Sequence, residues 1–228
     1  MSNYPKGSKM RKVFLNTALE IFLEKGYEKT TIQDIIDKIN VSKGSFYHYF
    51  QSKEDIIIQI AEEYVKDFSP IFNEIPFVDS LTPLEKLNMM INLVQMQKSK
   101  NDNHRKSIKD ALKNEDNYKL KQKIFEAIKI EATEAFTKVI NEGKEKGQFK
   151  VESTEEFVDF FYYAIHHLNV SIDDLVMKLS RKSISFSNFA LRLEEKLSFY
   201  ESLFAHSLNL DKGSLKLKES YLKRFLAS

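Results

Sequence analysis

The chain of 228 residues has no cysteine and no tryptophan, and it has only six glycines and four prolines. Without cysteine it forms neither disulfides nor thiolate metal sites, which fits a cytoplasmic protein. So few glycines and prolines argue against a β protein rich in turns. These absences favour an all-α fold.

Long apolar runs are also missing. No stretch approaches 18 consecutive apolar residues, so we expect no transmembrane helix and no membrane partner. The basic N-terminus leads into an amphipathic pattern instead of an apolar signal-peptide segment, which disfavours secretion. A hydrophobic content of 42% and a charged content of 30% are typical of a globular protein with a sizeable core.

A large excess of one charge is absent too. The net charge of +2 is too small to indicate a nucleic-acid partner by itself. Residues 1–53, however, carry nine Lys/Arg against five Asp/Glu. Four of these cations cluster at the start of the chain and could contact phosphates, although a solvated arm explains them equally well. They are Lys6, Lys9, Arg11 and Lys12.

Residues 31–53, TIQDIIDKINVSKGSFYHYFQSK, contain two short amphipathic segments separated by a break. Thr31 can cap the first segment, and Asp34 is spaced to complete a capping box. Asn40 then tolerates the left-handed backbone that a sharp turn needs. The apolar stripe of this segment consists of Ile32, Ile35, Ile36 and Ile39.

The second segment has one aromatic face and one polar face. Ser42 can cap it, while Phe46 and Phe50 share the inner side. The pattern predicts a helix-turn-helix with its recognition helix at 43–50. The side chains left pointing outward belong to Lys43, Gly44, Tyr47 and His48.

The outward residues suit the major groove of DNA. Gly44 removes a side chain where the helix would approach the duplex, and Lys43 can reach a guanine edge or a phosphate. Thr31 and Lys53 lie at helix starts, where free N–H groups favour anions. The predicted DNA-binding residues are Thr31, Ser42, Lys43, Gly44, Ser45, Tyr47, His48, Tyr49 and Lys53.

An ordinary packing role is the alternative for the aromatic members of this set. It applies most to Tyr49 and less to Tyr47, because Phe46 and Phe50 already fill the inner face. Single lysines are normally solvated, so Lys43 gains meaning only from the surrounding pattern.

Residues 9–55 resemble the N-terminal domain of the TetR/AcrR family of bacterial transcription regulators. The matching segments are EKGYEKTT at 24–31, DI at 34–35, VSKGSFYHYF at 41–50 and SKED at 52–55. The chain has Ile39-Asn40 where the family often has Ala-Gly, and Ile36 where alanine is common. The resemblance implies a transcription regulator that binds a double-stranded DNA operator as a homodimer.

Beyond the helix-turn-helix we expect only helices. We predict an N-terminal three-helix DNA-binding domain at 1–53 and a helical domain for ligand binding and dimerisation at 54–228. Gly143 and Gly147 are expected to end the long central helix. The predicted helices outside the motif are 8–25, 53–68 (followed by the disturbing Pro70 and Pro76), 83–98, 103–113, 115–144, 154–179, 185–209 and 213–226.

Two late helices carry long apolar stripes. The resemblance implies that such helices pair with their mates in a four-helix dimer interface, and one recognition helix covers only half of a two-fold operator. The alternative is that these stripes face the core of the same chain. The predicted interface residues are Phe161, Ile165, Leu168, Phe189, Leu193, Leu197, Tyr200 and Phe204.

Regulators of this kind commonly hold a small effector in the second domain. Aromatic and methionine side chains could line an apolar cavity there, although each is also an ordinary core residue. The predicted lining residues are Met89, Met90, Tyr118, Phe125, Phe136, Tyr162, Tyr163 and His166.

No cofactor is expected, and no metal, because His166-His167 lacks the i,i+4 spacing of a metal site while His104 and His206 are isolated. We do not expect an enzyme: nucleophile–base pairs are missing, and GKEKGQ at 143–148 lacks the phosphate-loop pattern. The leading hypothesis is a repressor that a small apolar or amphipathic ligand releases from DNA. The alternative is an architectural or division-linked DNA-binding protein without an effector, and activation stays open.

Overall fold

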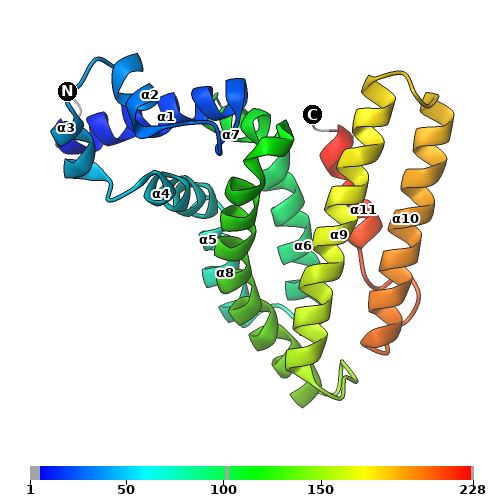
Figure 1. Cartoon of the computed structure of the whole chain (residues 1–228). Helices are drawn as coiled ribbons and strands as arrows, with labels where there is room; N and C mark the ends of the chain where they lie inside the picture. The colour runs from blue at the N-terminus through cyan, green and yellow to red at the C-terminus, as the bar shows by residue number, and fades with distance from the viewer. Residues whose placement is uncertain (1–5, 101–102, 227–228) are drawn as a thin grey trace. The chain divides into compact units, whose positions relative to one another are not determined.

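The computed structural model describes residues 6–100 and 103–226, and within these ranges it contains helices and no strand (Figure 1). The predicted all-α fold is confirmed. The α-helices are α1 (Lys6–Lys25), α2 (Ile32–Lys38), α3 (Lys43–Tyr49), α4 (Lys53–Val65), α5 (Ser69–Glu74), α6 (Pro83–Ser99), α7 (Asn103–Lys113), α8 (Tyr118–Glu145), α9 (Thr154–Ser180), α10 (Phe186–Ser207) and α11 (Leu217–Leu226). Two short 3-10 helices, η1 (Ile75–Phe77) and η2 (Glu115–Asn117), precede α6 and α8.

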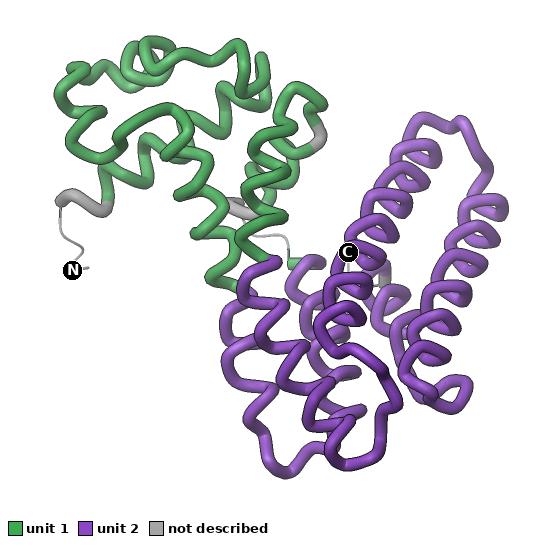
Figure 2. The backbone as a smooth tube through the Cα atoms, turned by 60° about the horizontal axis from the view of Figure 1, so that its bottom comes forward, with its two compact units in different colours: residues 1–67, 100–128 green, residues 68–99, 129–228 purple. Residues whose placement is uncertain are grey.

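The helices form two compact units (Figure 2). The first unit comprises residues 1–67 and 100–128, and the second comprises 68–99 and 129–228. The first unit is larger than the domain predicted at 1–53, because α7 and the beginning of α8 join it; α7 packs against α1. A functional division at residue 53 stays a prediction.

Aromatic rings form the centre of the first unit. Phe14 of α1 meets Phe46 of α3 edge to face, with ring centroids 5.8 Å apart, and Phe50 at 5.6 Å. All three side chains are buried. Ile35 and Ile36 add the buried face of α2. The two segments of the helix-turn-helix are therefore fastened to α1 by their apolar sides.

The second unit has a separate aromatic core. Phe161 of α9 lies 4.6 Å from Phe204 of α10 and 5.1 Å from Phe136 of α8, measured between ring centroids. On another side, α11 packs along α6, and its Tyr221 is fully buried. In Figure 1 the long helices α9 (yellow) and α10 (orange) run side by side, and they contact each other directly.

The helix ends follow the glycines and prolines, with one exception. Gly26, at φ +82°, ends α1 as predicted, and Gly147 adopts φ +69° after α8. Gly143 does not end α8 but lies inside it. A Cβ at this position would lie 2.1 Å from the Phe149 ring, so the glycine lets that ring pack against the helix.

The segment predicted as one helix through residue 68 is divided. The α-helix α4 ends at Val65, and α5 begins with Pro70 in its first turn, where a missing N–H costs nothing. Pro76 occupies the same kind of position in η1. The central helix likewise begins with a 3-10 turn, capped by the side chain of Asn114.

Candidate nucleic-acid interface

The first helix of the motif begins with the predicted capping box. The Asp34 N–H donates to Thr31 Oγ1 at 3.1 Å, and the Thr31 N–H donates to Asp34 Oδ2 at 2.7 Å. Lys25 lies 2.7 Å from the same carboxylate oxygen. The bond from Lys25, followed by those from Thr31, lowers the pKa of Asp34 to about 2. Asn40 then makes the turn at φ +53°, as predicted.

The second helix, α3, separates an aromatic face from a polar face. Ser42 Oγ accepts the N–H of Ser45 at 3.2 Å and so caps the helix as predicted. Phe46 and Phe50 are buried, whereas Tyr47 between them is 50% exposed. Because the inner face is filled by the two phenylalanines, Tyr47 is directed away from the core.

The outer face of α3 consists of Lys43, Gly44, Tyr47 and His48, all of which are exposed. The Lys43 ammonium lies 6.0 Å from the centre of the Tyr47 ring. A Cβ built on Gly44 would meet only Ser42 Oγ, at 3.7 Å, among the described residues that could oppose it. The fold of this chain therefore leaves room for a side chain at position 44, and packing does not explain the glycine.

Tyr49 belongs partly to the core. Its side chain is half-buried, and its ring centroid lies 5.8 Å from that of Phe14. His48 stacks edge to face against it at 4.8 Å. The packing alternative therefore describes Tyr49 well, whereas His48 covers its outer side.

Lys53 has a structural role that the sequence did not suggest. Its ammonium donates to the carbonyl oxygens of Tyr27 and Thr30, both at 2.8 Å, and lies 4.2 Å from the centre of the Tyr27 ring. Burial lowers its pKa. Its donors are directed at the turn before α2, and the predicted phosphate contact stays a prediction. The Thr31 hydroxyl is likewise engaged in the capping box.

The basic cluster at the start of the chain is not a uniform arm. Arg11 donates to Gln59 Oε1 at 2.6 Å and pairs with Glu63 Oε1 at 2.7 Å, which fastens α1 to α4. Lys9 and Lys12 are exposed. The side chain of Lys6, like that of His104, lies outside the described residues.

The residues predicted to line an effector cavity do not gather in one unit. Tyr118 and Phe125 belong to the first unit, and the remaining six belong to the second. Within the second unit Met90 and Phe136 are buried in the core. The other four are Met89, Tyr163 and His166, which are exposed, and Tyr162, which is half-buried. The predicted lining residues are thus divided between the two units, and the effector site stays a prediction.

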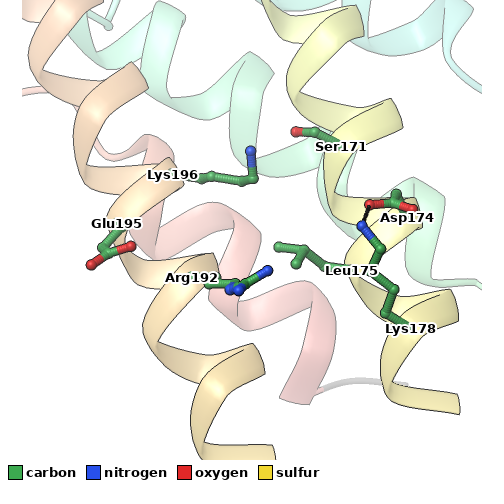
Figure 3. Close-up of a pocket in the computed structure, with 7 residues that line it drawn as sticks. All are labelled: Ser171, Asp174, Leu175, Lys178, Arg192, Glu195 and Lys196. Atoms are coloured by element: carbon green, nitrogen blue, oxygen red, sulfur yellow. Dashed lines mark hydrogen bonds and ion pairs between the residues drawn. The ribbon is translucent and has the colours of Figure 1, made fainter. Parts of the chain in front are cut away.

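A hollow of about 350 Å³ lies between α9 and α10 of the second unit (Figure 3). It contains both signs of charge: Lys178 pairs with Asp174 at 2.7 Å on α9, and α10 contributes two cations and one carboxylate. None of the predicted effector-lining residues borders it. Its lining consists of Ser171, Asp174, Leu175, Lys178, Arg192, Glu195 and Lys196.

The stripes predicted as a dimer interface face the core of this chain. Phe161, Leu168, Phe189, Leu193, Leu197 and Phe204 are all buried. Ile165 and Tyr200 are half-buried, and the Tyr200 hydroxyl lies 2.8 Å from Nδ1 of His167. Six of the eight side chains are thus packed inside their own chain, as the core alternative states, and the predicted interface stays a prediction.

A different apolar stripe is exposed on α9. Tyr163, Val170 and Met177 follow each other at intervals of seven residues and are 48%, 54% and 42% exposed. On α10, Phe199 is 62% exposed. The seven-residue spacing is visible in the sequence, but the larger aromatic residues of the inner stripe favour the other side of the helix.

Comparison with known proteins agrees with the local geometry. The family model described as bacterial regulatory proteins of the tetR family matches residues 14–60, which contain the helix-turn-helix. The transcriptional repressor KstR2 of Rhodococcus jostii is 35% identical over 79 residues, which cover 34% of this chain and 39% of that protein. The chain spans less than half the length of the curated relatives that it matches first.

Two solved structures share the fold of nearly the whole chain. A protein of Syntrophomonas wolfei assigned to the TetR-family regulators has a TM-score of 0.59 and 23% identity, and the match covers 88% of this chain and 97% of that one. SmeT in complex with triclosan has a TM-score of 0.63 and 13% identity, with coverage of 90% and 94%.

The described residues thus contain a capped helix-turn-helix in the first unit and further helices in a second unit. The helix-turn-helix within residues 14–60 is that of the tetR family of bacterial regulatory proteins, and the similar repressor and the similar solved structure point to the same family. None of the described helices is both long and apolar enough to cross a membrane.

Proposed function

We propose that this protein is a homodimeric repressor that binds a two-fold DNA operator through the outer face of α3 and leaves it when a small molecule binds. The observation that carries the proposal is the space at Gly44. The chain itself tolerates a side chain there, so the glycine is explained by a partner that approaches α3 closely. Lys43 and Tyr47 flank this position with a cation and an aromatic ring, which suit phosphates and base edges.

The dimer in this proposal uses the outward side of α9 and α10. The exposed stripe of Tyr163, Val170 and Met177 supplies apolar area. The adjacent hollow carries both cations and carboxylates. In a two-fold interface the same patch meets itself, so a patch that carries both signs is self-complementary. Binding to a two-fold operator requires that such a pair hold its two α3 helices about one DNA turn apart, ~34–36 Å.

The effector in this proposal binds the second unit. SmeT, which shares the fold, was solved with triclosan. Six of the eight residues predicted to line the effector site lie in the second unit, and the proposal retains these. A ligand that binds better to a conformation with differently spaced recognition helices shifts the population away from the DNA-bound form, by an amount limited to its differential affinity.

The test of DNA binding is fluorescence anisotropy with a duplex taken from upstream of the protein's own gene. Gly44→Ala should fold at least as well as wild type, because a helical Gly→Ala change stabilises by roughly 0.5 kcal/mol. The same variant should bind the duplex more weakly. Lys43→Ala/Tyr47→Ala should also lose affinity while remaining folded.

The matched control is Tyr118→Ala, which removes a tyrosine of the first unit that is 69% exposed but not on α3. It should bind the duplex like wild type. Equal binding by wild type, Gly44→Ala and the double variant would show that α3 is not the recognition surface.

The test of the effector is thermal unfolding in the presence of amphipathic compounds, beginning with triclosan. A compound that raises the midpoint should also release the duplex in the anisotropy measurement. A stabilising compound that leaves DNA affinity unchanged contradicts release by that ligand.

A further inference from the structure

The turn between α1 and α2, residues 26–30, sets where the helix-turn-helix begins. Gly26 reverses the chain at φ +82°, and the buried Thr30 hydroxyl donates to its carbonyl oxygen at 2.7 Å. The next residue, Thr31, is the cap of α2. A displacement of this turn therefore displaces α2 and, through it, α3.

Asn117 holds this turn from a position 90 residues away in the sequence. Its side chain is fully buried, and Oδ1 accepts the N–H of Tyr27 at 2.7 Å. Nδ2 donates to the carbonyl oxygens of Phe22 at 2.9 Å and Ala111 at 2.7 Å. Both amide hydrogens are used, so one side chain joins the last turn of α1, the turn after it and the end of α7.

The residues beside Asn117 tighten the same contact. Asp116 pairs with Lys29 at 2.7 Å, and its Cβ would lie 2.4 Å from a Cβ placed on Gly26. Asn114 donates at 3.3 Å to carbonyl oxygens in the last turn of α1. The 3-10 turn that starts α8 thus lies directly against the end of α1.

The turn is also held from its other side, by Lys53 at the start of α4, as described above. It is therefore fixed between α4 and the segment that opens α8. The helix α8 begins at Tyr118, immediately after Asn117, and continues without interruption from the first unit into the second at residue 129. The helix α8 therefore begins directly after the contact with the turn.

We propose that Asn117 is a positioning residue that couples α7 and the beginning of α8 to the helix-turn-helix. When α3 moves on DNA, it displaces α2 and the turn before it. The turn then displaces Asn117 and, with it, the beginning of α8. Because coupling between two sites is reciprocal, a change in α8 acts on α3 by the same connection. The proposal rests on DNA binding by α3 as proposed above.

A purely structural role for Asn117 predicts a loss of stability and nothing else. Asn88 provides the matched control, because its Nδ2 donates to the Ser214 carbonyl oxygen at 2.9 Å and its Oδ1 accepts the Lys216 N–H at 2.8 Å. These bonds fasten α6 to the connection before α11 in the second unit. Asn88→Ala therefore removes the same kind of bond away from the turn.

The experiment is hydrogen exchange of the full-length protein with and without a saturating amount of the upstream duplex. In wild type and Asn88→Ala, DNA should slow exchange in α2 and α3 and also in residues 103–128. In Asn117→Ala, DNA should still protect α2 and α3, whereas the protection of 103–128 is lost. A merely structural asparagine would not separate these two responses.

Protection of 103–128 that persists in DNA-bound Asn117→Ala overturns the proposal, as does its absence in DNA-bound wild type. If the wild-type protein binds no DNA, the proposed function is overturned instead. This result is known before any variant is compared. If circular dichroism shows that Asn117→Ala is unfolded, Asn114→Ala takes its place. That variant should weaken the protection of 103–128, and unchanged protection contradicts the coupling.

Discussion

The helices α3 and α9 both carry apolar residues on two sides, yet only α3 was placed correctly from its sequence. In α3, with seven residues, the prediction puts Phe46 inside and Tyr47 outside, and the structure agrees. In α9, with 27 residues, the stripe predicted to meet a partner chain is buried, and another stripe is exposed. Helical periodicity identifies a face, but it does not identify what the face contacts.

The difference has a physical origin. A short capped helix has few turns, and its two phenylalanines can be buried on only one side, so the remaining side is outside by elimination. The longer α9 satisfies helical spacing twice, with Phe161 and Leu168 on one side and Tyr163 and Val170 on the other. Which side is covered depends on how the other helices pack.

The largest expected effect on stability comes from removing a side chain on the inner side of α3. Phe46→Ala should lower the free energy of unfolding by ~3–5 kcal/mol, because a fully buried ring leaves a cavity between α1 and α3. Tyr47→Ala, one position along, should change it by less than about 1 kcal/mol. Urea unfolding followed by circular dichroism compares the two. Similar losses for both variants would mean that Tyr47 is part of the core.

The same contrast can be made in the long helices. Leu197→Ala should lower the free energy of unfolding by ~2–5 kcal/mol, since the side chain is fully buried. Val170→Glu/Met177→Glu should retain its helicity but shift the protein from dimer to monomer, as measured by light scattering after size-exclusion chromatography. A double variant that stays dimeric places the interface elsewhere.

Lys53 and Lys43 separate a structural cation from a DNA-binding one. Lys53→Met should lower the free energy of unfolding by ~1–3 kcal/mol, because carbonyl oxygens of the turn lose their donor. It should leave the salt dependence of DNA affinity unchanged. Lys43→Ala should reduce the slope of log affinity against log salt by about 1. If Lys53→Met also reduced the slope of log affinity against log salt, the result would support the predicted contact between Lys53 and a phosphate.

The smallest expected effect concerns the capping box. Folding holds the pKa of Asp34 at about 2, below its ordinary value of 3.8, chiefly through the bond from Lys25. The folded state therefore binds fewer protons, so this contribution is complete above about pH 4 and is lost as the pH falls toward about 2. Asp34→Asn should flatten that part of the stability profile. An unchanged profile shows that the carboxylate contributes nothing.

Sequence reasoning was most successful where the contacts are local. The caps at Thr31 and Ser42, the turn at Asn40 and the inner face of α3 depend on residues within a few positions of each other, and each was predicted. The contacts of Lys53 and Asn117 with the turn before α2 could not be predicted in this way, because they join residues 23 or more positions apart in the sequence. Gly143 was predicted as a helix end although it lies inside α8, because a glycine pattern does not reveal that the Phe149 ring packs against the helix at this position.

Footprinting of the upstream duplex by hydroxyl radicals tests the central claim, that a symmetric pair of α3 helices binds successive major grooves. The account predicts two protected patches with their centres about one helical turn, ~10 base pairs, or a small multiple apart, both lost in Lys43→Ala/Tyr47→Ala. A single protected patch, or two patches that persist in the double variant, would contradict it.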